Sequence, residues 1–205
     1  MRIYSIFLLS ALALGLPGCV MIPYESPEAR AKIEHDLGVA PADVIGITET
    51  NWCPYTYGVA EICHATQGLG VLTKKGFILS LYQNKSYIPV RTLRVDEVTC
   101  AKVTEGRDKP EIFYVFTKDD AFMLAPITPG GRVNIPMKLK IFDYLLGNRQ
   151  KVFSGVEGSF VKFTGERVMR YVTVPGYKPG WAIVDEFAIV NPCPSATQSQ
   201  PAAQN

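Results

Sequence analysis

The sequence is poor in the residues and motifs that carry most enzyme chemistry. It has two histidines in 205 residues. It lacks the glycine-flanked serine of a nucleophile elbow, the paired histidines of a zinc helix and the complete glycine patterns of phosphate-binding and dinucleotide-binding loops. These absences predict a protein that is not an enzyme.

Neither sign of charge is in clear excess, because the chain has 21 Lys and Arg residues and 19 Asp and Glu residues. Nucleic-acid binding usually requires a strong basic excess, so nucleic acid is not expected as a partner. No pair of cysteines has the C-x-x-C spacing of a structural zinc site. We therefore expect no metal and no dissociable cofactor.

The N-terminus is the most specific stretch of the chain. Arg2 is followed by an apolar or small-residue run at 6–16, which is too short to span a bilayer because a spanning helix takes about 18–20 residues. The run ends in LPGC, which resembles the lipobox of bacterial lipoprotein signal peptides. This resemblance implies that residues 1–18 are removed and that Cys19 carries a diacylglycerol and an N-acyl chain.

The predicted acyl chains would hold the protein on a membrane almost permanently, since each buried CH₂ contributes about 0.8 kcal/mol. Residue 20 is valine and not aspartate, which in the lipoprotein sorting scheme favours the outer membrane, facing the periplasm. Two alternatives remain open, an ordinary secretory signal and an uncleaved N-terminal membrane anchor.

Four cysteines remain once Cys19 is assigned to lipid, and an even number in an exported protein predicts two disulfides. The four are Cys53, Cys63, Cys100 and Cys193. They allow three connectivities, and we prefer 53–63, which closes a short loop, with 100–193, which fixes the C-terminal segment to the central sheet.

Two helices are predicted with explicit ends. SPEARAKIEHDLG predicts a surface helix that is capped by Ser26 and ended by Gly38. NIPMKLKIFDYLLG predicts an amphipathic helix that packs on a sheet, with Lys138 facing elsewhere. Its expected buried stripe is Ile135, Leu139, Phe142 and Leu146.

Between the two helices the pattern alternates with period two, and turn signals recur every eight to twelve residues, as in antiparallel strands. A change of parity between Val95 and Val98 suggests a bulge in one long strand. The predicted strands are 43–50, 57–66, 69–73, 77–82, 86–90, 93–103, 111–117 and 121–126.

This order, a run of short strands closed by one amphipathic helix, resembles the pleckstrin-homology-like and GRAM-like small barrels. The similarity rests on GLGVLTKKGFILSLYQNKSYIPVRTLRVDEVTCAKV, IFYVFTKDDAFML and the second helix. It implies a mainly β, α+β fold in which an antiparallel meander forms a small barrel. A lipocalin-like fold or another β sandwich is the alternative.

The domain boundaries follow from these elements. Residues 19–25 are predicted to be a lipidated tether and residues 26–193 a single domain, with a core at 43–147 and a β extension at 148–193. In the extension a hairpin is expected to turn at Gly165. Residues 194–205 contain no large apolar residue and are predicted to be disordered.

One group of basic residues suggests ligand binding. Lys74, Lys75 and Lys85 are expected on neighbouring hairpin tips, where basic residues of pleckstrin-like domains hold phosphates. The alternative is that these lysines serve solubility. A nucleophilic pair of Cys63 and His64 would need the cysteine to be free.

The sequence thus predicts a non-enzymatic binding or structural module of the cell envelope, anchored to the membrane by lipid and contacting an envelope protein. The alternatives are a carrier or sensor of a small apolar or anionic ligand and an enzyme that acts on envelope material.

Overall fold

The computed structural model describes residues 22–60, 63–103, 112–147, 160–173 and 178–193. The predicted signal peptide, Cys19 and the predicted C-terminal tail lie outside this part of the chain. Within it, no helix is both long and apolar enough to cross a membrane. The elements are α1 (Pro27–Leu37), η1 (Pro41–Asp43), β1 (Val44–Thr56), β2 (Thr66–Thr73), β3 (Gly76–Gln83), β4 (Ser86–Arg94), β5 (Cys100–Val103), β6 (Phe113–Phe116), β7 (Asp120–Ile127), α2 (Ile135–Leu146), β8 (Val161–Val172) and β9 (Gly180–Ile189).

Seven strands form one antiparallel sheet in the order β4-β3-β2-β1-β7-β6-β5. β1 is central because it pairs with β2 on one edge and with β7 on the other. The predicted mainly β, α+β fold is therefore confirmed. The expected closure into a barrel is not found, because no ladder between described residues joins the outer strands β4 and β5.

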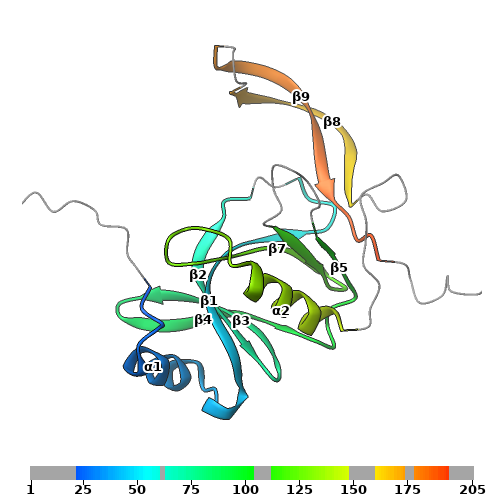
Figure 1. Ribbon diagram of the computed structural model, residues 1–205. Helices are drawn as coiled ribbons and strands as arrows, with labels where there is room; N and C mark the ends of the chain where they lie inside the picture. The colour runs from blue at the N-terminus through cyan, green and yellow to red at the C-terminus, as the bar shows by residue number, and fades with distance from the viewer. Residues whose placement is uncertain (1–21, 61–62, 104–111, 148–159, 174–177, 194–205) are drawn as a thin grey trace, which may run out of the picture.

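Helix α2 covers one face of this sheet (Figure 1). Phe142 and Leu146 are buried as predicted, but Ile135 and Leu139 are exposed. The side that faces the sheet is rotated, so that Lys138 is buried with Ile141 and Leu145, against the prediction. Both stripes have helical spacing, and the sheet decides which one is covered.

Helix α1 begins and ends as predicted. The Ser26 hydroxyl accepts a hydrogen bond from the Ala29 N–H at 3.1 Å, and Gly38 ends the helix in the left-handed region at φ 63°. The helix buries Ile33 completely and packs beside β4. Residues 22–25, predicted to belong to the tether, instead join the fold, because Ile22 and Tyr24 are buried in the same cluster as Ile33.

Two predicted strands are wrong. Of the described residues in the predicted strand 57–66, only Thr66 lies in a strand, at the start of β2, because β1 continues to Thr56 and the chain then turns at Gly58, where φ is 78°. The predicted strand 93–103 is two strands separated by a turn. In that turn Arg94 binds the carboxylate of Asp96 through two nitrogens, at 2.9 and 2.8 Å, so the charged residues close a local loop in place of a bulge.

β8 and β9 form a separate two-stranded sheet. The hairpin turn predicted at Gly165 is not there, because β8 runs through it. Gly165 lies instead in a bulge between Phe163 and Arg167 and takes φ 94°, a conformation that favours glycine. The hairpin therefore turns between the ends of β8 and β9, and its two strands are much longer than predicted.

Candidate functional site

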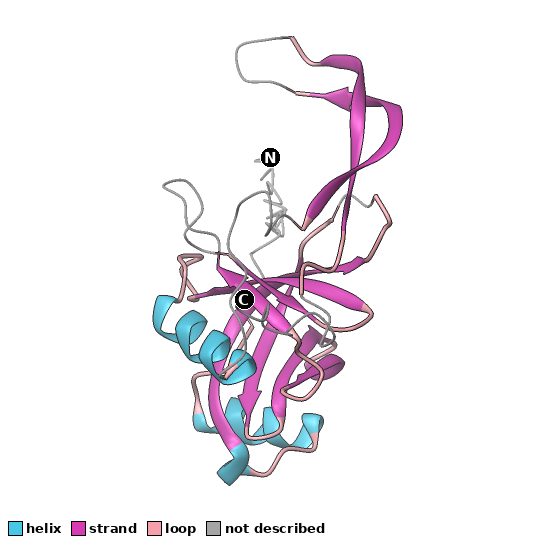
Figure 2. Cartoon of the chain, turned by 90° about the vertical axis from the view of Figure 1, so that its right-hand side faces the viewer, coloured by secondary structure: helices cyan, strands magenta, loops and turns pink. Residues whose placement is uncertain are grey.

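The β8–β9 hairpin, called the arm below, extends away from the body of the protein. Figure 1 shows it at the opposite end of the molecule from α1, and the rotated view in Figure 2 shows the same separation. β8 has twelve residues, so at about 3.3 Å per residue the arm is about 40 Å long. A two-stranded ribbon has little core of its own, and its faces are available for contact.

One face of the arm carries a row of large apolar side chains. Residues that pair directly across an antiparallel ladder lie on the same face, and the register pairs Tyr171 with Trp181 and Phe163 with Phe187. The members of this apolar stripe are exposed by between 45 % and 70 %. They are Val161, Phe163, Met169, Tyr171, Trp181, Ile183 and Phe187.

An ion pair interrupts the stripe at its middle. Arg167 Nε donates to Asp185 Oδ1 at 2.9 Å, and both side chains are exposed. The register places this pair on the same face as the stripe, between Met169–Ile183 on the tip side and Phe163–Phe187 on the body side. The face is thus apolar at both ends and charged at its centre.

The opposite face of the arm is less exposed between the bulge and the tip. Val168 and Val184 pair there and are half-buried. Arg170 binds Glu186 at 3.0 Å, with 31 % and 17 % of the two side chains exposed. Arg170 and Glu186 neutralise each other on this face, so of the two faces the stripe is the one that the described residues leave uncovered.

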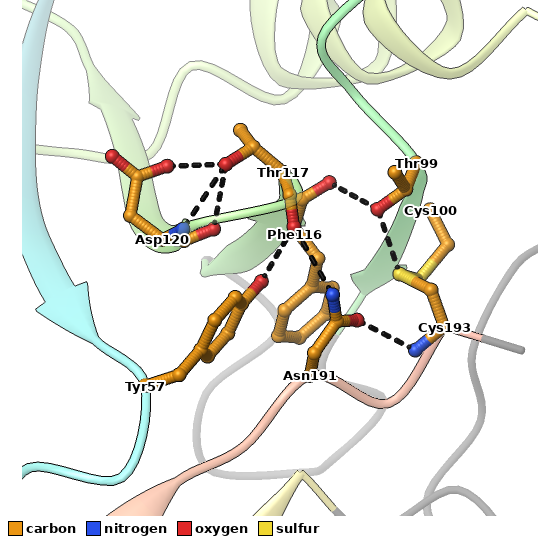
Figure 3. The surroundings of a disulfide bond; sticks show 8 residues. All are labelled: Tyr57, Thr99, Cys100, Phe116, Thr117, Asp120, Asn191 and Cys193. Atoms are coloured by element: carbon orange, nitrogen blue, oxygen red, sulfur yellow. Dashed lines mark hydrogen bonds between the residues drawn. A yellow bond between two sulfur atoms is a disulfide. The ribbon is translucent and has the colours of Figure 1, made fainter. Parts of the chain in front are cut away.

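The arm is held at its base by a disulfide and a set of hydrogen bonds (Figure 3). Cys100 of β5 is joined to Cys193, which follows β9. Asn191 Nδ2 donates to the Thr117 carbonyl at 3.2 Å, and the Asn191 side-chain oxygen accepts from the Cys193 N–H at 2.9 Å. The Tyr57 hydroxyl donates to the same Thr117 carbonyl at 2.9 Å.

Burial around this base shifts the pKa values of Tyr57 and Lys102, among other groups. The pKa of Tyr57 is raised, chiefly by burial and further by the negative charges of Asp120 and Asp119, so its hydroxyl remains a donor. Burial also lowers the pKa of Lys102, whose ammonium lies 4.6 Å from the centroid of the Phe160 ring.

Backbone bonds close the base of the arm and join it to the body. The Val190 N–H donates to the Phe160 carbonyl at 2.8 Å and so links the two strands at their base, and the Gly58 N–H, which follows β1, donates to the Ile189 carbonyl at 2.8 Å. Phe160 and Ile189 are buried in one cluster with Phe116 of β6. The direction of the arm is therefore fixed at its base by packing, backbone bonds and a covalent link.

The two disulfides are the predicted ones, Cys53–Cys63 and Cys100–Cys193. His64 is exposed beside the bonded Cys63, so the structure does not assemble a free thiol and imidazole pair. Among the described residues, no group of three His, Cys, Asp or Glu side chains is arranged to hold a metal ion.

The three lysines are not brought together. Lys74 and Lys75 lie in the turn between β2 and β3, whereas Lys85 lies in the turn between β3 and β4. These turns are at opposite ends of β3, so the expectation of neighbouring tips is wrong. Lys74 faces a negative group of the protein itself, since its Nζ lies 3.7 Å from Asp43 Oδ1.

A surface hollow of about 340 Å³ lies between α1, the start of β1 and α2. Arg30 and Glu34 contribute its charged groups, and Gly46 and Met137 are part of its floor. Its acidic and basic side chains both come from helix α1.

The sequence did not predict the arm as a projecting two-stranded element. FVKFTGERVMRYV and WAIVDEFAIV are rich in β-branched and aromatic residues, as strands are. Such composition predicts strands, but it does not show whether another layer covers their faces. The length of the two matching runs was the available signal for a long ribbon.

Comparison with known proteins gives no family. No family model matches the chain, and no curated protein matches it. Nine chains of solved structures match. One of them is described as Vav1 inhibited by an allosteric inhibitor, with 11 % sequence identity and a TM-score of 0.39, over 73 % of this chain and 42 % of that chain.

Proposed function

We propose that this protein is a non-enzymatic lipoprotein of the bacterial outer membrane, facing the periplasm, that binds another protein through its arm. The observation that carries the binding role is the apolar stripe. A face that exposes apolar side chains over several hundred Å², here in two segments on either side of one ion pair, is typical of an interaction site. Here it lies on an element that projects from the body and is fixed at its base.

The lipid anchor is supported by the LPGC sequence, and the burial of Ile22 limits how far the folded domain can lie from Cys19. Ile22 is buried, and three residue steps separate it from Cys19. Three steps span at most about 11 Å, so a lipid on Cys19 would hold the folded domain against the membrane surface. The two disulfides support an oxidising compartment.

This anchor would also give the arm a direction. Ile22 and Tyr24 pack in one cluster with Ile33 of α1, and the arm leaves the body at the end opposite to α1 (Figure 1). With α1 near the membrane, the arm would extend away from it into the periplasm. A partner in that compartment would meet the stripe before it met the body.

The anchor is tested by labelling cells with radioactive fatty acid. Cys19→Ser should abolish the label and release the protein from the membrane fraction. Gly18→Ala keeps a small residue before the cysteine and should leave labelling intact. Continued labelling of Cys19→Ser, or no labelling of the unchanged chain, would show that the lipoprotein assignment is wrong.

The binding role is tested separately by a photo-crosslinking residue in place of Ile183, which is 63 % exposed on the arm. The control position is Leu139, which is 50 % exposed on α2. We expect a covalent adduct with a protein chain from Ile183 and none from Leu139. Equal adducts from both positions, or none from Ile183, would remove the arm as a binding surface.

A further inference from the structure

We propose that the partner of the arm is a second copy of this chain, with the two stripes packed face to face and the two tips pointing the same way. This inference rests on the proposed function, because it requires the arm to be a binding surface. It adds the identity of the partner and the geometry of the pair.

The area of the stripe suits a protein interface. Its four aromatic side chains, exposed by 50 % to 70 %, offer on the order of 450 Å² if each contributes about 200 Å² when fully exposed. The other three apolar members and the ion pair bring this face near the roughly 800 Å² per partner of a standard stable interface. Two copies of the stripe therefore supply the surface that a dimer buries, without any contribution from the bodies.

The charges at the centre of the stripe favour a second copy related by a two-fold axis along the arm. Such an axis keeps each residue at its distance from the tip and exchanges the β8 side with the β9 side. Arg167 then faces the partner's Asp185, and Asp185 faces the partner's Arg167. The two ion pairs of the two copies form one network of alternating charge.

The same axis matches the apolar positions. Tyr171 faces the partner's Trp181, and Met169 faces the partner's Ile183, because these residues are paired across the ladder. Each aromatic pair meets an aromatic pair, and each aliphatic pair meets an aliphatic pair. The face is self-complementary in charge and in the kind of side chain at every level along the arm.

The alternative two-fold axis, which crosses the arm at its middle, gives a poorer match. It places Arg167 over the partner's Arg167 and Asp185 over the partner's Asp185, and like charges in contact are strongly unfavourable. It also directs the two bodies to opposite ends of the dimer. The axis along the arm leaves both N-terminal ends on one side, as two copies anchored in one membrane require.

A lipid surface is a poorer partner for the stripe than a second copy, because of the ion pair at the centre of the stripe. The Arg167–Asp185 pair lies between the two apolar halves of the stripe. A bilayer that covered the stripe would bury this pair in hydrocarbon with no added hydrogen-bonding group, which is costly for charged side chains. A second copy covers the pair with its own complementary charges.

The test uses two differently tagged copies of the full chain, expressed together, extracted in detergent and purified through one tag. We expect the second tag to be recovered, and light scattering corrected for detergent to give the mass of two chains. Ile183→Asp should reduce recovery at least tenfold, whereas Leu139→Asp on α2 should leave it unchanged. Circular dichroism checks that both variants remain folded.

A charge exchange identifies the axis. The double variant Arg167→Asp, Asp185→Arg keeps an ion pair within each arm and should recover its own kind as well as the unchanged chain does. Mixed with the unchanged chain, it places Asp against Asp and Arg against Arg, and recovery should fall at least tenfold. Recovery of the mixed pair equal to the unchanged pair would overturn the proposed interface, and better recovery would assign the axis across the arm.

These outcomes separate this inference from the proposed function. A protein that is monomeric in every preparation, but whose Ile183 crosslinks to a different polypeptide, would overturn the dimer and leave the binding role of the arm standing. Retention of the purified chain on anionic vesicles through the stripe, with no dimer, would overturn the proposed dimer in favour of a lipid surface. A chain that yields no adduct from Ile183 and no dimer would remove both.

Discussion

Removing the Cys100–Cys193 disulfide should lower the free energy of unfolding by more than removing Cys53–Cys63. The first bond joins residues separated by 93 positions and the second joins residues separated by 10. In the chain-entropy account the stabilisation grows as 1.5 RT ln n, so the difference between these loops is about 2 kcal/mol. The absolute losses are about 4.6 and about 2.7 kcal/mol.

The two disulfides have similar burial, so the comparison isolates the effect of loop length. Each bond joins one fully buried cysteine, Cys53 or Cys100, to one that is half-buried, Cys63 or Cys193. Replacing both members of either pair by alanine therefore leaves a similar cavity, and the packing loss cancels in the difference. What remains is the length of the loop that each bond closes.

The assay is urea denaturation of the unchanged chain and of the two double-alanine variants, followed by circular dichroism. With a slope of about 2 kcal/mol per molar urea, the midpoints of the two variants should differ by about 1 M. A chain without Cys53–Cys63 that is equally or less stable than a chain without Cys100–Cys193 would refute the reasoning. The unchanged chain under reducing conditions should be less stable than either variant.

Two further predictions concern the fold. Lys85 occupies the left-handed region at φ 61°, where a side chain costs about 1–2 kcal/mol. Lys85→Gly should therefore raise the free energy of unfolding by about 1 kcal/mol. Lys75→Gly is the control and should not raise it, because Lys75 is a turn residue without a positive φ. Hydrogen bonds from Lys32 and from the Tyr87 N–H lower the pKa of Asp36 to about 2. The stability that this group contributes is therefore present above pH 4 and is lost as the pH falls towards 2. Unfolding curves measured from pH 5 to pH 2 should show this loss, and Asp36→Asn should make the free energy of unfolding depend less on pH over that range. An unchanged pH dependence in the variant would contradict the assignment.

Features with a local physical cause could be predicted from the sequence. A serine cap and a left-handed glycine define the ends of α1 within the stretch of chain that forms it. The disulfide pairing followed from an even number of cysteines and from the expected position of the C-terminal segment. The change from helix to antiparallel strands followed from the period of the apolar residues.

Features that depend on neighbours distant in the sequence were not predicted. The buried side of α2 is chosen by the sheet beneath it, and its sequence offers two apolar stripes, one containing Leu139 and one containing Leu145. Barrel closure depends on whether β4 and β5 meet, which no single segment determines. The stripe on the arm looks like the inner face of a covered sheet, and only the arrangement in space shows that nothing described lies over it.

If Cys19 carries the proposed lipid, the three residue steps between it and Ile22 have a consequence for how two copies would encounter one another. A domain held so close to its lipid could not tumble freely, so all copies on one membrane would carry their arms at the same height and with similar tilt. Their search for one another would then be confined to a thin layer parallel to the bilayer. The contact that is recovered in detergent would be more highly populated there, because confinement raises the effective concentration and removes most wrong orientations before the arms touch.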